Sequence, residues 1–158
     1  MDLVQVGATW LHLIATVAML GYYAILGLLV LPVLRQLVSA RQLGETIAGV
    51  ERRALPVIIG SLAVFLATGV YLMGADERYG GVGNVTGSAW ASLILAKHVV
   101  VGVMVGLGIY IDALIVRRIA PPEATDQTAA VRKLAVAAGV MTLLGAVVLF
   151  LTAAGQAS

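Results

Sequence analysis

Four long apolar segments dominate this sequence and constrain its fold more than any other feature. A helix needs about 20 mostly apolar residues to cross a bilayer. Four stretches meet this requirement, at residues 8–34, 55–73, 90–116 and 134–154. Only 11% of the 158 residues are charged, whereas soluble domains average about 25%. The sequence therefore predicts an all-α integral membrane protein, a four-transmembrane-helix bundle that forms a single domain over residues 1–158.

Prolines and basic residues mark the expected ends of these segments. Pro32 is expected to help end the first helix, and Pro56 to lie in the first turn of the second, where its missing N–H costs nothing. This places residues 35–54 in a loop. Pro121 and Pro122 are expected to interrupt helical structure in the loop between the third and fourth segments.

The distribution of basic residues predicts how the bundle is oriented. The first and third connections carry four Lys or Arg each, whereas the glycine-rich second connection carries one. Because cytoplasmic loops collect Lys and Arg, we expect both termini and the second connection on the outer, periplasmic side. An aromatic belt would mark the same boundary. Its expected members are Trp10, Tyr71, Tyr79 and Trp90.

Several classes of site and partner are excluded by composition. The chain has no cysteine, which excludes disulfides, thiolate metal sites, iron–sulfur clusters and covalent c-type haem. No basic stripe with interleaved aromatics is present, so we expect no nucleic-acid partner. No catalytic motif is found, so no catalytic residue is assigned and a non-enzymatic role is preferred. The expected partners are the lipid bilayer and either further copies of the chain or a larger membrane complex.

Four ionisable residues fall inside the apolar segments, where such groups are expensive and usually functional. His12 lies about one turn into the first segment, and Lys97 and His98 lie about two turns into the third, counted from the same side. Antiparallel helices would bring these three residues to a similar depth. Asp112 lies near the other end of the third segment. We expect it to form an ion pair with a loop arginine, namely Arg35, Arg52 or Arg117.

A polar stripe follows His12 along the first helix. Thr16, Met19 and Tyr23 share its face at helical spacing. Imidazole and thioether groups bind copper, above all Cu(I), and imidazole also ligates haem iron. The candidate copper ligands are His12, His98, Met19 and Met104. The candidate haem ligands are His12 with either His98 or Lys97, and the sequence leaves open which of these two faces the interior. Ordinary hydrogen bonding and packing remain the structural alternative for each residue.

A glycine pair in the third segment has a simpler interpretation. Gly102 and Gly106 are four residues apart, a spacing that lets two helices approach closely. We expect this pair to pack inside the bundle.

These residues together resemble a known membrane protein family. Trp10-Leu11-His12-Leu13, Leu31-Pro32-Val33-Leu34-Arg35 and Ala96-Lys97-His98 are similar to the CopD family of bacterial copper-handling proteins. The resemblance covers roughly residues 9–154. It implies copper transport or sequestration at the bacterial cytoplasmic (inner) membrane.

The chain also resembles the HemJ-type protoporphyrinogen oxidases. That resemblance implies haem b held by His12 and Lys97. The chain departs from the HemJ pattern at Met19-Leu20-Gly21, where those oxidases usually have a Trp-Phe-Ala-Gly stretch. Three hypotheses follow: copper handling, a haem b protein for electron transfer or porphyrinogen oxidation, and a cofactor-free accessory subunit. The cofactor is thus left as a copper ion or haem b.

Overall fold

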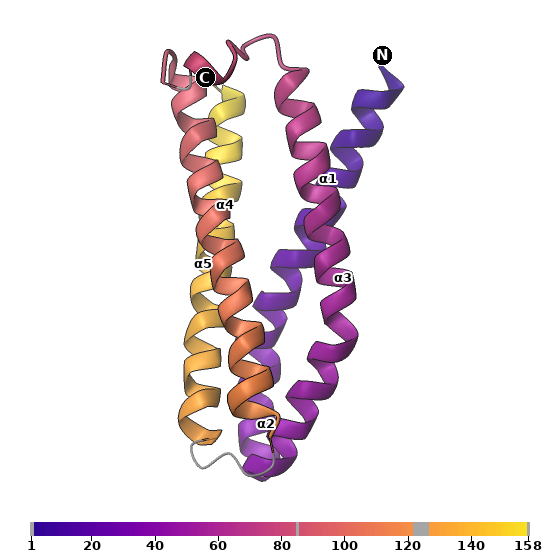
Figure 1. Cartoon of the computed structure of the whole chain (residues 1–158), viewed down its shortest axis with the longest axis vertical. Coiled ribbons are helices and arrows are strands. Elements are labelled where there is room, and N and C mark those ends of the chain that lie inside the picture. The colour runs from indigo at the N-terminus through magenta and orange to yellow at the C-terminus, as the bar shows by residue number, and fades with distance from the viewer. Residues whose placement is uncertain (1, 85, 122–126, 158) are drawn as a thin grey trace.

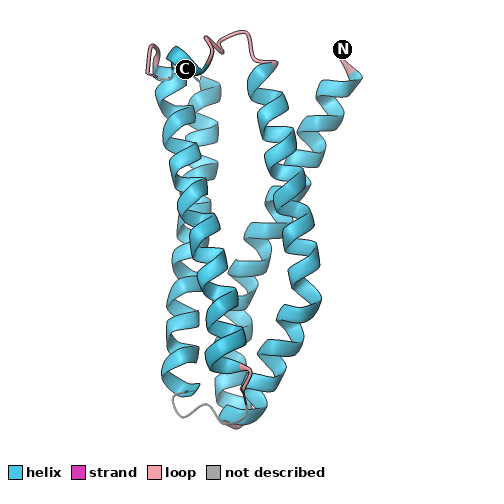
Figure 2. Ribbon diagram, viewed as in Figure 1, coloured by secondary structure: helices cyan, strands magenta, loops and turns pink. Residues whose placement is uncertain are grey.

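The computed structural model describes residues 2–84, 86–121 and 127–157 and is all-helical over them. The first helical column comprises α1 (Leu3–Ile25), the π-helical turn η1 (Leu26–Val30) and α2 (Leu31–Leu37). The other three are α3 (Ala40–Gly74), α4 (Ala89–Leu114) continued by η3 (Ile115–Ile119), and α5 (Gln127–Ala157), with a short η2 (Val82–Asn84) before α4. All four columns are long and apolar enough to cross a membrane. The predicted fold class is therefore confirmed (Figures 1 and 2).

The columns form two antiparallel pairs, one of α1 with α3 and one of α4 with α5. The pairs lie together near α2 and spread apart toward the end where N and C are marked (Figure 1). We call the narrow end, which carries most of the arginines, the arginine end, and the wide end the terminal end. The largest fully buried side chains are Leu31, Ile47, Ile111, Ile115, Ile119, Leu134 and Met141.

Small residues let the two pairs approach each other closely. A Cβ atom at Gly27 would lie 3.1 Å from the Cβ of Ala138 on α5, and a Cβ at Gly145 would meet the side chain of Leu20. Helices in lipid associate mainly through such close packing, because lipid is as apolar as the helix surface. Gly102 and Gly106, in contrast, are exposed, and a Cβ atom added at either would have no neighbouring atom within 4 Å. Our prediction that this pair packs inside the bundle is wrong.

Helix α3 begins at Ala40, so the prediction of a loop over residues 35–54 is also wrong. Ser39 and Gln42 form a capping box in which each side chain accepts a hydrogen bond from the other's backbone N–H, over 3.4 and 3.1 Å. Such reciprocal capping stabilises a helix start. Leu43, Ile47 and Glu51 then follow at four-residue spacing and are all buried. This buried face makes the segment helical although its other face is polar.

The prolines lie within helices more often than expected. Pro56 is inside α3 rather than in its first turn, and the first column continues past Pro32 to Leu37. A proline ring clashes with the carbonyl four residues earlier, and π turns occur as single-turn bulges within α-helices. The π turn η1 ends just before Pro32, and η3 ends just before Pro121. Pro122 lies outside the described residues.

The close contact at Gly27 predicts a specific packing defect. We expect Gly27→Val to destabilise the bundle by about 1–3 kcal/mol, as overpacking usually does, because the new side chain meets α5. Thermal unfolding of the purified protein in detergent, followed by circular dichroism, would measure the change. Gly102→Val adds the same atoms on an open surface and is the control. Equal stability losses in both variants would contradict this account of the contact.

Candidate functional site

His12 is held by three neighbouring residues of α3. Its Nδ1 lies 2.9 Å from the hydroxyl oxygen of Thr68. Its ring stacks on Phe65, with centroids 4.4 Å apart and planes 23° from parallel. A Cβ at Gly69 would lie 3.3 Å from the ring, so glycine leaves room for the imidazole. These contacts fix the ring between α1 and α3.

The hydrogen bonds around Thr68 determine which nitrogen of His12 is free. The Thr68 hydroxyl carries one hydrogen, and the carbonyl of Val64 lies 2.6 Å away. We assign the hydrogen to that short bond, so the hydroxyl acts as an acceptor toward His12. Nδ1 of His12 then donates, which leaves the lone pair of the neutral ring on Nε2. His12 therefore presents an unprotonated nitrogen that can bind a metal ion.

The structure brings Lys97, and not His98, toward His12. Lys97 is half-buried, and its charge acts on His12 across the bundle. His98 is exposed, and its Nδ1 donates to the Ile94 carbonyl of its own helix over 2.7 Å. The two residues are neighbours on a helix and point about 100° apart. His98 is therefore separated from the other candidate ligands.

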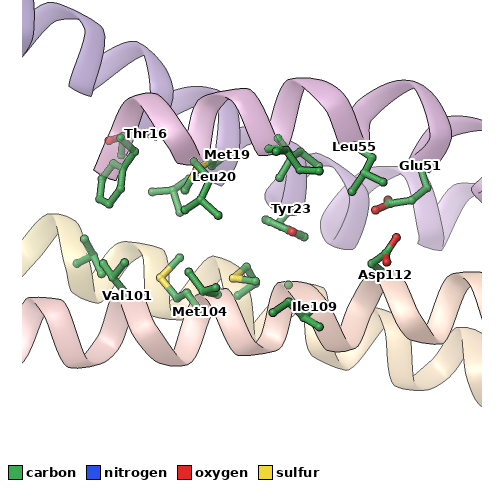
Figure 3. Close-up of a pocket in the computed structure, with 18 residues that line it drawn as sticks. Thr16, Met19, Leu20, Tyr23, Glu51, Leu55, Val101, Met104, Ile109 and Asp112 are labelled. Atoms are coloured by element: carbon green, nitrogen blue, oxygen red, sulfur yellow. The ribbon is translucent and has the colours of Figure 1, made fainter. Parts of the chain in front are cut away.

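A cavity of about 270 Å³ lies between the two helix pairs. His12 does not line the cavity but lies just beyond its terminal end, next to Phe65 and one turn before Thr16, which both line it. Figure 3 shows Thr16 at one end of the cavity, with Met19 and Leu20 facing α4 from α1. The walls are mainly apolar. Three thioethers also line the cavity, from Met19, Met104 and Met141.

The opposite end of the cavity is acidic. Glu51 from α3 and Asp112 from α4 face each other there (Figure 3). The Tyr22 hydroxyl donates a hydrogen bond to Glu51. Asp112 has no ion pair among the described residues, so the prediction of a loop-arginine partner is wrong. Asp112 is turned toward α3, whereas Arg117 is exposed.

Sequence reasoning missed three parts of this site. Glu51 was assigned to a loop because Pro32 and Pro56 were expected to mark helix ends, although its four-residue spacing from Ile47 indicated a buried helix face. Thr68 was given no role in the site, since hydroxyls are common in membrane helices. Met141 lies in a uniformly apolar segment. Its position in the cavity wall depends on how α5 is rotated against the other helices.

A polar cluster connects the second loop to two helices at the terminal end. Arg78 donates to both carboxylate oxygens of Asp76 over 2.9 Å and to the Gly155 carbonyl over 3.0 Å. Its guanidinium also lies 5.3 Å from the ring centroid of Trp90. Trp90 is buried, whereas Trp10 is 61% exposed. Trp90 therefore anchors the loop instead of facing lipid in the predicted aromatic belt.

This cluster gives the stability of the protein a weak dependence on acid. Hydrogen bonds from Arg78 hold the pKa of Asp76 below its usual range. A lowered folded-state pKa contributes stability above the unfolded-state pKa of about 4, and that stability is lost as the pH falls further. We expect the thermal midpoint of Asp76→Asn to fall less between about pH 5 and pH 3 than that of the wild type. Asp side chains protonate over roughly this pH range. Glu77→Gln, a neighbouring exposed change, should keep the wild-type drop, and equal drops in all three proteins would contradict the assignment.

Comparison with known proteins identifies the family. Residues 48–154 match the protein family described as copper resistance protein D. This match covers more than half of the chain and includes Glu51, Lys97, Met104 and Asp112, whereas His12 precedes it. No curated protein and no solved structure shows significant similarity to the chain. With four apolar helical columns and this match, the chain is a multi-pass membrane protein that belongs to the copper resistance protein D family.

Proposed function

We propose that this protein transports or sequesters copper in the bacterial cytoplasmic membrane, with Cu(I) held in the cavity between the two helix pairs. The observation that supports this most is the set of three thioethers that line one cavity. His12 lies just beyond the terminal end of that cavity, and the hydrogen bond at its Nδ1 leaves Nε2 unprotonated. Thioether and imidazole groups are ligands that suit Cu(I).

The arrangement of these donors fits a cargo ion better than a permanent one. Thioethers are neutral and bind weakly, so an ion can pass from one sulfur to the next. Thr68 orients the imidazole in the way that outer-shell hydrogen bonds orient metal ligands in other proteins. The apolar walls exclude water and thereby favour a weakly hydrated monovalent ion. In this proposal the ligands are His12, Met19 and Met104, joined by Met141.

The predicted orientation would give the cavity a direction. With the arginine end in the cytoplasm, His12 lies on the periplasmic side of the thioethers. Copper would then meet the imidazole first when it enters from outside. The proposal needs no further subunit for binding, although a continuous pathway across the membrane would require the helix pairs to move or other copies to join.

Haem b is the second candidate, because His12 of α1 and the half-buried Lys97 of α4 belong to opposite helix pairs and interact electrostatically. These two side chains would supply axial ligands, and the haem would supply one-electron chemistry. The cavity of about 270 Å³ is smaller than the roughly 300–1,000 Å³ of pockets for drug-sized ligands. A haem macrocycle does not fit it unless the helix pairs separate. The cavity as it stands therefore favours the copper ion.

Cu(I) titration of the purified protein under reducing conditions tests the copper proposal. We expect the wild type to bind Cu(I), and His12→Ala to bind it much more weakly. Thr68→Val should lower the affinity by about tenfold, because it removes the group that orients the ring. His98→Ala is the matched control, since this histidine lies outside the cavity, and its affinity should not change. Copper binding that depends on His98 and not on His12 would refute the proposed site.

A substitution of Lys97 distinguishes the two cofactors, because this residue would oppose the binding of Cu(I) but support the binding of haem. An ammonium group near His12 repels a bound cation, so Lys97→Leu, which removes the charge without adding a ligand, should strengthen Cu(I) binding. If haem is the cofactor, the same substitution removes a ligand of the iron and should weaken haem binding. Absorbance spectra before and after reduction, together with copper and iron content, separate these results. Loss of a Soret band in Lys97→Leu would establish the haem alternative.

A further inference from the structure

The acidic end of the cavity holds ionisable groups that the copper proposal does not use. Glu51 is 6% exposed, and it faces Asp112 across the gap between α3 and α4 (Figure 3). Tyr22 and Tyr23 of α1 lie beside the pair, and the Tyr22 hydroxyl donates to Glu51. Carboxyl groups within membrane helices are rare, and most have a functional role.

Tyr23 adds a hydroxyl group to this end of the cavity. Its side chain is 8% exposed and lines the cavity. The hydroxyl has no hydrogen-bond partner in the part of the chain that the structure describes. It lies over Gly108, where a Cβ would be only 3.3 Å away. Because no buried side-chain oxygen among the described residues lacks a partner, this hydroxyl is open to the cavity and can bond a polar group there.

The two carboxyl groups also lack a positive charge to balance them. Among the described residues, no Lys or Arg lines the cavity, and α5 contributes no ionisable group to it. Arg52 and Arg53 on α3 are exposed and form no ion pair with either acid. Two ionised carboxylates that face each other away from water repel strongly. Enzymes with such pairs relieve the repulsion by retaining one proton between them.

We propose that Glu51 and Asp112 form a proton-binding site that holds one proton at neutral pH. Tyr22 donates a hydrogen bond to Glu51, and the Tyr23 hydroxyl faces the same end of the cavity. Asp112 is five residues from Arg117, which is about 7.5 Å along a helix. The site therefore lies close enough to the arginine end to exchange its proton with water on that side.

A proton fits this site better than a metal ion does. No group of three or more His, Asp or Glu side chains that could hold a metal occurs among the residues described. Carboxylate oxygens are hard ligands, whereas Cu(I) prefers sulfur and imidazole. The site is also at the opposite end of the cavity from His12. The proposal therefore stands independently of copper binding.

Infrared difference spectroscopy of the full chain in lipid nanodiscs tests this proposal directly. Spectra are recorded between neutral and alkaline pH, in H2O and in D2O. We expect the wild type to show a protonated carboxyl C=O band at neutral pH that shifts in D2O and disappears on alkaline titration. The double variant Glu51→Gln/Asp112→Asn should lose this band. Each single variant should change the band, because one of the two carboxyl groups is gone.

Two further variants separate a proton site from a merely structural cluster. Glu45→Gln changes an exposed glutamate on the same helix, paired with Arg41 at 3.1 Å, and should leave the band unchanged. Tyr22→Phe should shift the band frequency without removing it, because the hydrogen bond that Tyr22 donates to Glu51 is lost. The proposal is overturned if the wild type has no protonated carboxyl band at neutral pH, or if the double variant retains it. If the double variant does not fold, the wild-type and Tyr22→Phe spectra decide the question, and an unshifted band in Tyr22→Phe counts against the site.

Discussion

The close approach of the first helical column to α5 determines where the cavity lies. A Cβ atom added at Gly27 would lie only 3.1 Å from the Cβ of Ala138, so a larger residue would require the neighbouring helix to shift. In a membrane the hydrophobic effect gives no net attraction between apolar helices, so such contacts and buried hydrogen bonds hold a bundle together. The two helix pairs meet at this contact and diverge toward the terminal end (Figure 1). A space remains between them that can be filled by thioethers or a ligand.

The fold was largely predictable because the bilayer imposes a simple rule. Every backbone polar group in the hydrocarbon must be satisfied within its own segment, so an apolar run of sufficient length is a helix. The errors in the helix boundaries came at the arginine end, where the rule weakens. There residues 40–54 are amphipathic, and the buried sequence Leu43, Ile47 and Glu51 was masked by the arginines on the opposite face. Pro56 misled in the same way, because a proline tolerated inside a helix looks like one at its start.

The site was predictable only in part, for a geometric reason. Depth along a helix can be counted from sequence, and this placed His12 and Lys97 at a similar level. The direction in which a side chain points depends on how each helix is rotated against its neighbours. Lys97 and His98 could not be separated without that rotation, and Met141 could not be assigned to any site. Thr68 became meaningful only when α3 was seen beside His12.

The two ends of the cavity have different chemistry, and the difference follows from the cost of charge in a membrane. Neutral donors, such as an imidazole and three thioethers, can remain inside the bundle without compensation. Carboxyl groups cannot, unless they pair with a cation or retain protons. Glu51 and Asp112 lie near the arginine end, where water is close enough to exchange a proton, whereas the thioethers lie deeper. A chain with this arrangement separates soft ligands from titratable groups within a single cavity, so that occupation of one end by a cation can be felt electrostatically at the other.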